Sequence, residues 1–478
     1  MIKHFASLAA LAILLTASAA QALPLYSARA GRTCDNCHSL PNTWYDPPAM
    51  ADRKCTLSCA GCHVDPSGGG LRTVSGRYYG ETTLPFFGAR DRPLADRGHW
   101  PDAASAEPPN LGAPSSQPTS GPVKPVAESP VDPRGPDAPP ADRGLLTFGR
   151  PLLHGSSKMA WLDGRYGDLR ADPLLNLGAD LRLGFWNFGP LIFPMQTDVY
   201  AAVHPVEHLT LNVSVGGRGR ARSPVFEGDG RDDQPRFGVR DAWLMTHEWP
   251  YLSYARVGRF LPNFGTRVAD HTAPIRRAFG MSQEDPANRV IGAEVGFTAN
   301  YPYFAGSFFK PSTLDARNPF ALGDGYGAAV SGGWRDLGWQ LGASGMIRRR
   351  SLETGGDTTD VSLQWGFNPW RYAEWLPLTY LGEATFGFYQ RKFSGKETSQ
   401  LAAYHELGWA AWPGVIAKLR YDFWEPDTEV VNDEMHRPGL GLDLTVISGL
   451  TISADARALF PAGGNPGADI FVQVHGWF

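Results

Sequence analysis

The sequence predicts an all-β chain that closes as a membrane-spanning barrel of about 16 strands, preceded by a cysteine-bearing segment and a proline-rich linker. Segments of about ten residues in 144–478 alternate apolar and polar side chains, and tight turns alternate with longer polar loops. After the first 22 residues no run of 18 apolar residues follows, so any crossing of a bilayer requires strands. Hydrophobic residues make up 42% and charged residues only 19% of the 478-residue chain, which favours an apolar outer surface.

The alternation is clearest near the C-terminus. Leu419 lies between Lys418 and Arg420, and Arg457 lies between two alanines. Charges in the middle of apolar strands favour a barrel with a polar lumen over the alternatives, a soluble β-sandwich or propeller. Since a strand with its connection takes about 20 residues, 144–478 gives about 16 strands. Aromatic residues at the predicted strand ends suggest an interfacial girdle, and the chain stops on Phe478 in a terminal strand; the girdle set is Trp365, Trp370, Trp375, Tyr380, Trp409, Trp412, Trp424 and Trp477.

The first 22 residues read as a secretory signal peptide. A short basic start precedes an apolar run that ends at Ala20-Gln21-Ala22, a small-x-small cleavage pattern. The mature chain is therefore expected to begin near Leu23 and to be exported. Together with the barrel, this predicts the outer membrane of a Gram-negative bacterium.

Residues 93–143 form the predicted linker. They contain thirteen prolines among many Ala, Ser, Asp and Gly residues, a composition that cannot bury a core and favours an extended, disordered chain. At roughly 3 Å per residue such a chain could extend on the order of 100 Å. The predicted organisation is thus signal peptide 1–22, cysteine-bearing segment 23–92, linker 93–143 and barrel 144–478.

All five cysteines lie between Cys34 and Cys62, and four of them form two C-x-x-C-H motifs. In an exported chain this motif attaches haem c, because the two thiols add to the haem vinyl groups and the adjacent histidine ligates iron. Zinc binding and disulfides are the alternatives, but neither requires a histidine after each pair. The sequence therefore predicts two haem c groups, attached at Cys34 and Cys37 with His38 as proximal ligand, and at Cys59 and Cys62 with His63 as proximal ligand.

The distal iron ligands have no motif of their own. Met50 would give a His/Met iron with a raised potential, and His99 a bis-His iron with a lower one. A histidine of the barrel lumen is a further option, and the candidates are His204, His208, His405 and His475. The fifth cysteine, Cys55, has an irregular spacing and is expected not to attach haem.

The cysteine-bearing segment resembles a known family. Residues 23–38 look like the mature N-terminus of fused outer-membrane cytochrome–porins, including iron-oxidising cytochromes, and residues 59–72 are similar to multihaem porin-like cytochromes. Residues 254–265 resemble a strand–turn segment of anion-type porins. The resemblance implies electron conduction through the outer membrane. The chain departs from the iron-oxidising type by carrying two haem motifs and a long proline-rich linker.

The function expected from these features is electron transfer across the outer membrane rather than enzymatic turnover, with iron oxidation or reduction as a possible activity. The expected partners are outer-membrane lipid, a periplasmic electron carrier such as a cytochrome, and extracellular iron or another redox partner. Lys418, Arg420 and Arg457 are expected to face haem propionates or the chain beside them. The alternative is a solute porin with a tethered periplasmic dihaem cytochrome; the close spacing of the motifs disfavours a dihaem peroxidase. Without a basic patch and with a net charge of −4, nucleic acid is not an expected partner.

Overall fold

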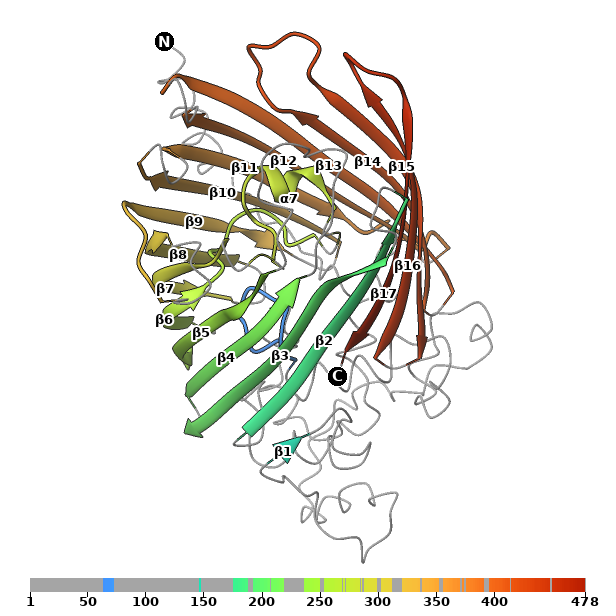
Figure 1. Cartoon of the computed structure of the whole chain (residues 1–478). Helices are drawn as coiled ribbons and strands as arrows, with labels where there is room; N and C mark the ends of the chain where they lie inside the picture. The colour runs from blue at the N-terminus through green and yellow to red at the C-terminus, as the bar shows by residue number, and fades with distance from the viewer. Residues whose placement is uncertain are drawn as a thin grey trace, which may run out of the picture.

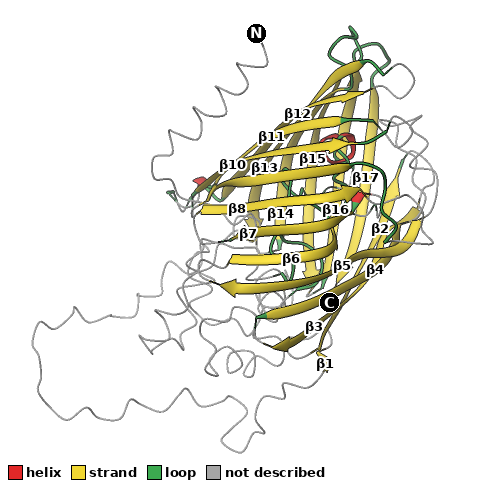
Figure 2. Ribbon diagram, turned by 90° about the vertical axis from the view of Figure 1, so that its left-hand side faces the viewer, coloured by secondary structure: helices red, strands yellow, loops and turns green. Residues whose placement is uncertain are grey.

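A computed structural model describes residues 63–72, 146–147 and 175–477 apart from short stretches, mainly in the connections. Strands β2 to β17 form a closed antiparallel barrel, since β17 pairs with β2 and β9 pairs with β10 (Figure 1 and Figure 2). The prediction of an all-β barrel of about 16 strands is confirmed. A two-residue strand, β1 (Leu146–Thr147), pairs in parallel with the start of β2. The barrel strands are β2 (Leu175–Trp186), β3 (Ile192–Val206), β4 (Leu209–Arg218), β5 (Arg236–Trp249), β6 (Ser253–Phe260), β7 (Val290–Phe297), β8 (Pro302–Pro311), β9 (Tyr326–Arg335), β10 (Trp339–Arg349), β11 (Thr358–Phe367), β12 (Leu378–Gln390), β13 (Glu397–Trp412), β14 (Val415–Glu425), β15 (Met435–Ile447), β16 (Leu450–Pro461) and β17 (Gly467–Trp477).

The strands alternate as their sequences predict. On β14, Leu419 is 54% exposed on the outer surface, whereas its neighbours Lys418 and Arg420 are buried on the lumen side. Similar apolar residues face outward on the other strands, for example Val199, Val295 and Val330. An apolar outside and a polar inside are the signature of a barrel that crosses a membrane. Among the described residues, no helix is long and apolar enough to span a bilayer.

The two ends of the barrel differ in their connections. Short connections such as 207–208, 413–414 and 448–449 lie at the end where β2 begins and β17 ends. Longer connections, such as 219–235, 312–325 and 426–434, lie at the opposite end. In outer-membrane barrels the short turns are periplasmic and the long loops extracellular. These ends are called the short-turn end and the long-loop end below.

The connection between β6 and β7, residues 261–289, enters the barrel and is called the inward segment (Figure 1). It contains the short helix α7 (Pro274–Ala278) and reaches the wall formed by β14 to β16. There Asp270 pairs with Arg420 at 2.5 Å and with Arg457 at 3.2 Å. Nearer its start, the Thr266 amide donates to the Glu383 carboxylate of β12 at 2.8 Å. The inward segment therefore leaves the wall at β6 and β7, crosses the lumen and is fixed to the opposite wall at β12 to β16.

The predicted aromatic girdle is correct only in part. Trp375 and Trp409 are exposed, as a girdle requires. Trp477, by contrast, is buried on the lumen side of β17, and Trp424 packs against the buried core. Strand periodicity explains the difference, because Trp424 has the same parity as Arg420 and Trp477 the same parity as Gln473, both of which face inward. Phe478 lies outside the described residues.

Candidate functional site in the barrel lumen

Residues 63–72 form a hairpin that begins at the histidine of the second C-x-x-C-H motif. His63 and Arg72 form an antiparallel bridge, and the Val64 amide donates to the Leu71 carbonyl at 3.0 Å. The turn is closed by Asp65, whose carboxylate accepts the Ser67 amide at 2.9 Å. Three consecutive glycines, 68 to 70, have φ of 87°, 82° and 63°. Only glycine takes such values readily, so the sequence Ser-Gly-Gly-Gly determines this turn.

The turn of the hairpin is held by two arginines of the barrel. Arg256 of β6 donates to Asp65 at 3.0 Å and also pairs with Glu294 of β7 at 2.8 Å. Arg267 of the inward segment donates to the Gly68 carbonyl at 2.7 Å. Burial alone would raise the pKa of Asp65, but Arg256 and Arg267 lower it well below its usual range. Asp65 is therefore a carboxylate held between the wall and the inward segment.

The open end of the hairpin is held by β2 and β17. Arg72 pairs with Asp180 at 3.5 Å and stacks over the Trp477 ring, with 4.0 Å between guanidinium and ring centroid. The Asn176 side chain donates to the Arg72 carbonyl at 3.1 Å. Since Asn176 is the second residue of β2 and Trp477 the last of β17, this end of the hairpin lies toward the short-turn end.

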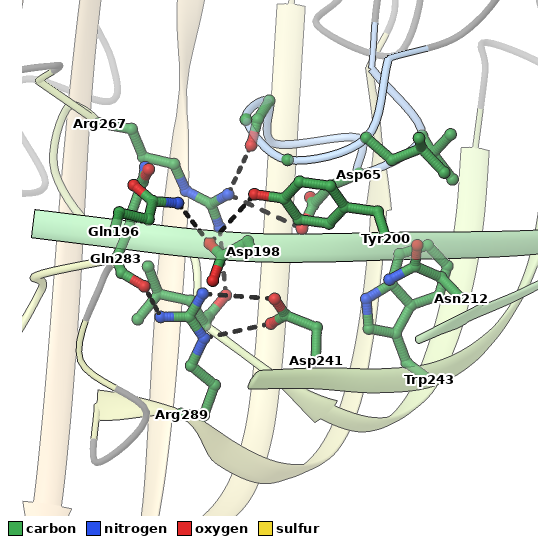
Figure 3. Close-up of a pocket in the computed structure, with 16 residues that line it drawn as sticks. Asp65, Gln196, Asp198, Tyr200, Asn212, Asp241, Trp243, Arg267, Gln283 and Arg289 are labelled. Atoms are coloured by element: carbon green, nitrogen blue, oxygen red, sulfur yellow. Dashed lines mark hydrogen bonds and ion pairs between the residues drawn. The ribbon is translucent and has the colours of Figure 1, made fainter. Parts of the chain in front are cut away.

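The hairpin also packs tightly against the wall. Val64 and Leu71 are 1% and 3% exposed and belong to one buried cluster with Tyr200 and Trp243. Figure 3 shows the small cavity left between the hairpin, this wall and the inward segment, with Asp241 and Arg289 paired at 3.2 Å beneath it. Its volume is about 40 Å³, enough for one or two water molecules. The hairpin therefore packs against this wall and leaves between them a space of only a few water molecules.

His63 is in a form that can ligate a metal. Its imidazole is buried, and burial first, then the charge of Arg72, lowers its pKa to about 4. It is therefore neutral at physiological pH, as iron ligation requires. This fits the proximal role that the motif predicts. The other predicted haem residues lie outside the described residues; they are Cys34, Cys37, His38, Met50, Cys59, Cys62 and His99, and the same holds for Cys55.

Within the described part of the chain, the basic lumen residues pair with carboxylates of the barrel. Lys418 pairs with Asp443 at 2.7 Å, Arg420 with Asp455 at 3.1 Å and Arg457 with Asp469 at 3.5 Å. Arg420 and Arg457 also hold Asp270 of the inward segment, which belongs to the barrel. Their contact with the haem segment therefore stays a prediction. Carboxylates neutralise them, and they do not form a free cationic surface for propionates.

The four candidate lumen histidines separate into three groups. His475 faces inward and lies 3.1 Å from Asp180. His204 faces inward and lies 3.0 Å from the Thr210 hydroxyl, whereas His208 is exposed in the β3–β4 connection. His405 is on the outer surface, because its neighbours Tyr404 and Glu406 are the buried, inward residues of β13. The expectation that His405 is a ligand in the lumen is wrong, because successive residues of a strand point to opposite faces of the sheet.

The residues that hold the hairpin were not identified from the sequence. Arg256 and Arg267 lie in and just after the stretch that resembles anion-type porins, and Asp180 lies in β2. Parity could have placed Arg256 in the lumen, since it alternates with Ala255 and Val257. Nothing local indicated that its partner would be Asp65, which is 191 residues away.

Comparisons with known proteins concern the barrel alone. No family model and no curated protein matches the chain. Among solved structures, an anion-selective porin from Comamonas acidovorans is similar over 64% of this chain and 99% of that one, with a TM-score of 0.44 and 10% identity. OprB from Pseudomonas putida is similar over 64% and 93%, with a TM-score of 0.44 and 11% identity. The channel DcaP from Acinetobacter baumannii covers 64% and 97%, with a TM-score of 0.41 and 11% identity.

Proposed function

We propose that this chain is an outer-membrane electron-transfer protein whose dihaem c segment docks in the lumen of a porin-like barrel. The observation that carries the proposal is the hairpin 63–72, which is fixed inside the barrel and starts at the histidine of a haem motif. In the sequence Cys62 directly precedes His63, which is a buried residue of this hairpin. This supports a position of the second haem at the short-turn end of the lumen.

The residues that would hold the haems are those of the two motifs. Cys59, Cys62 and His63 would hold one, and Cys34, Cys37 and His38 the other, with Met50 and His99 as candidates for distal ligands. When bound, haem c supplies a one-electron iron couple. The protein's own contribution is positional: Asp65, Arg256 and Arg267 hold the hairpin, and the barrel encloses non-barrel chain without exposing its backbone to lipid.

The proposed transfer has one partner on each side of the membrane. A segment that docks from the periplasmic end can accept electrons from, or donate them to, a periplasmic carrier such as a cytochrome. The exchange on the other side of the membrane is with extracellular iron or another redox partner. Electron transfer without turnover of a bound substrate is the expected activity, with iron oxidation or reduction as its outcome.

A second candidate function is that of a solute channel with a tethered dihaem segment. The favouring observation is the barrel itself, with 16 strands, a polar lumen and an inward segment that narrows it. In this alternative the docked hairpin would leave a path for small solutes elsewhere in the lumen. The two candidates differ in what crosses the membrane, so transport measurements separate them.

The test is to reconstitute the holoprotein in liposomes that contain a trapped reductant and to add an impermeant ferric acceptor outside. Electron transfer predicts reduction of the acceptor by the intact protein and its loss in Cys62→Ala, whose barrel is unchanged. Single-channel recording on the same preparations measures the alternative. Open-pore conductance without reduction of the acceptor would assign the chain to the solute channels.

A further inference from the structure

The junction between β17 and β2 is the place where the barrel closes (Figure 1). Among the barrel strands β2 to β17, it is the one junction whose two strands are not consecutive in sequence, so no connection joins them. The pairing runs from Phe471 opposite Trp186 to Trp477 opposite Asp180. Beyond this last pair β2 extends further, and its first two residues pair with β1 instead. This junction is called the seam below.

The hairpin 63–72 reaches both strands of the seam through Arg72. The guanidinium of Arg72 pairs with Asp180 of β2 at 3.5 Å and lies 4.0 Å from the ring centroid of Trp477 on β17. The Arg72 carbonyl also accepts the Asn176 side chain of β2 at 3.1 Å. From β17, His475 reaches the same carboxylate, since its Nε2 lies 3.1 Å from Asp180. One residue of the hairpin therefore contacts both members of the last seam pair.

Arg72 contributes charge as well as contact. Asp180 is 4% exposed, and its other hydrogen-bond partners are Tyr200, whose hydroxyl donates at 2.9 Å, and His475. Neither of these two side chains carries a permanent positive charge, so the loss of Arg72 would leave the buried carboxylate without its ion-pair partner, which is costly. If the end of the seam separated, Arg72 would lose either the ion pair with Asp180 or the stack on Trp477. Both contacts therefore oppose opening of the seam.

The residues on either side of this contact are themselves held in place. The turn of the hairpin is anchored by Asp65 to Arg256 of β6 at 3.0 Å, four strands away from β2. The apolar side chains of the hairpin are buried against the wall. On the other edge of β17, the Trp477 amide donates to the Gly449 carbonyl of the β15–β16 turn at 2.8 Å. Because the hairpin is fixed to the wall at a distance from the seam, it can resist movement of the two seam strands.

We infer that the docked hairpin is a clamp that holds the seam closed, so that stable closure of the barrel depends on the segment that bears the second C-x-x-C-H motif. The first and last strands of the barrel are then joined by a segment that is not itself part of the sheet. In a chain whose hairpin is undocked, the seam opens at the short-turn end. The clamp depends on the hairpin and not on haem or electron transfer, so its failure would leave the proposed function open.

The test compares Arg72→Ala with Arg267→Ala in the full-length protein, by amide hydrogen exchange. Both arginine side chains are 17% exposed and hold the hairpin, but Arg267 contacts its turn and not the seam. Arg72→Ala is expected to raise the exchange rate of residues 471–477 and 180–186 by about tenfold or more. Arg267→Ala should raise exchange in the hairpin alone. Unchanged exchange of the seam in Arg72→Ala would overturn the clamp, and so would an equal rise in both variants.

A disulfide across the seam gives an independent measurement. Leu183 and Val474 are opposite each other on the outer surface of the seam, and Leu211 and Leu244 are opposite each other between β4 and β5. Directly opposite residues of neighbouring strands have Cβ atoms close enough for a disulfide. Each pair is replaced by two cysteines in a Cys55→Ala background, so that the pair between β4 and β5 is the matched control.

The measured quantity is the temperature at which the barrel loses its fast-migrating form on a denaturing gel. Arg72→Ala is expected to lower this temperature, and the seam disulfide should restore it, whereas the control disulfide should not. If Arg72→Ala forms no barrel by itself, the same comparison applies to recovery of the fast-migrating form. Equal rescue by both disulfides, or rescue by neither, would overturn the clamp, because the loss would then not lie at the seam.

Discussion

At the residue scale, the pairing of Asp65 with Arg256 accounts for how a segment far from the barrel in sequence is held within it. The Arg256 side chain is fully buried and has two carboxylate partners, Asp65 and Glu294. If Asp65 is removed, only Glu294 compensates the buried guanidinium of Arg256, so the loss of Asp65 costs more than the loss of a surface ion pair. A small number of buried charges therefore holds the hairpin at this position in the barrel.

Asp65→Asn is expected to loosen the hairpin by about 2–3 kcal/mol, somewhat below the cost for a fully buried pair, because Asp65 is 17% exposed. Hydrogen exchange of residues 64–71 should rise while the strands stay protected. The control is Asp443→Asn. Asp443 pairs with Lys418 and is about as exposed as Asp65, but it does not contact the hairpin, so this variant should leave the hairpin protected. Equal protection of the hairpin in both variants would mean that Asp65 does not anchor it.

The two haem motifs make a prediction by mass. The mature protein is expected to carry two covalent haem units, which survive acid–acetone extraction. Cys37→Ala and Cys62→Ala should each lose one unit, whereas Cys55→Ala should lose none, because its spacing to His63 is irregular. Intact mass spectrometry measures the number of haem units. A single unit in the wild type would mean that one of the two motifs does not attach haem.

At the scale of elements, strands could be predicted from the sequence and the inward segment could not. Alternation identified β14 to β17 and the lumen side of Lys418, Arg420 and Arg457, because strand parity is a local property. The inward segment lacks such a period, and its position depends on pairs such as Asp270 with Arg457, 187 residues apart. The hairpin could be read as a glycine turn, but its docking depends on residues 104 to 199 positions away.

The tether of the inward segment is expected to persist in moderate acid. Burial would raise the pKa of Asp270, but Arg420 and Arg457 lower it well below its usual range. In the unfolded chain the pKa of an aspartate is near 3.9. A lower pKa in the folded state stabilises the fold at every pH above that value, and this stabilisation is lost only as the pH falls through the pKa of the folded state. Resistance of the wild-type inward segment to proteolysis should therefore be the same at pH 7 and pH 5.

Asp270→Asn is the corresponding variant and should expose the inward segment to proteolysis at both pH values. Asp285→Asn is the control within the same segment, since Asp285 pairs with Arg218 at 3.2 Å and not with the far wall. It should leave the tip around Thr272 protected. If Asp285→Asn exposed the tip to cleavage and Asp270→Asn did not, Asp270 would not be the residue that holds the inward segment.

At the scale of the whole molecule, the barrel determines where the protein is found. Its outer surface is apolar around most of the circumference, so the protein should fractionate with the outer membrane. An unboiled sample should migrate faster than a boiled one on a denaturing gel, because a closed sheet resists detergent. Recovery in the soluble periplasmic fraction would contradict the membrane assignment.

The contact between Asn176 and the Arg72 carbonyl also has a consequence for the proline-rich stretch. Arg72 ends the docked hairpin and Asn176 begins the barrel, so residues 73–174 leave and return to the same place at the short-turn end. The two described ends of this stretch, Arg72 and Asn176, are in direct contact, so no distance between them has to be bridged. Because the entropy of closing a loop depends only weakly on its length, removal of residues 93–143 should leave the haem count and the hairpin's exchange protection unchanged.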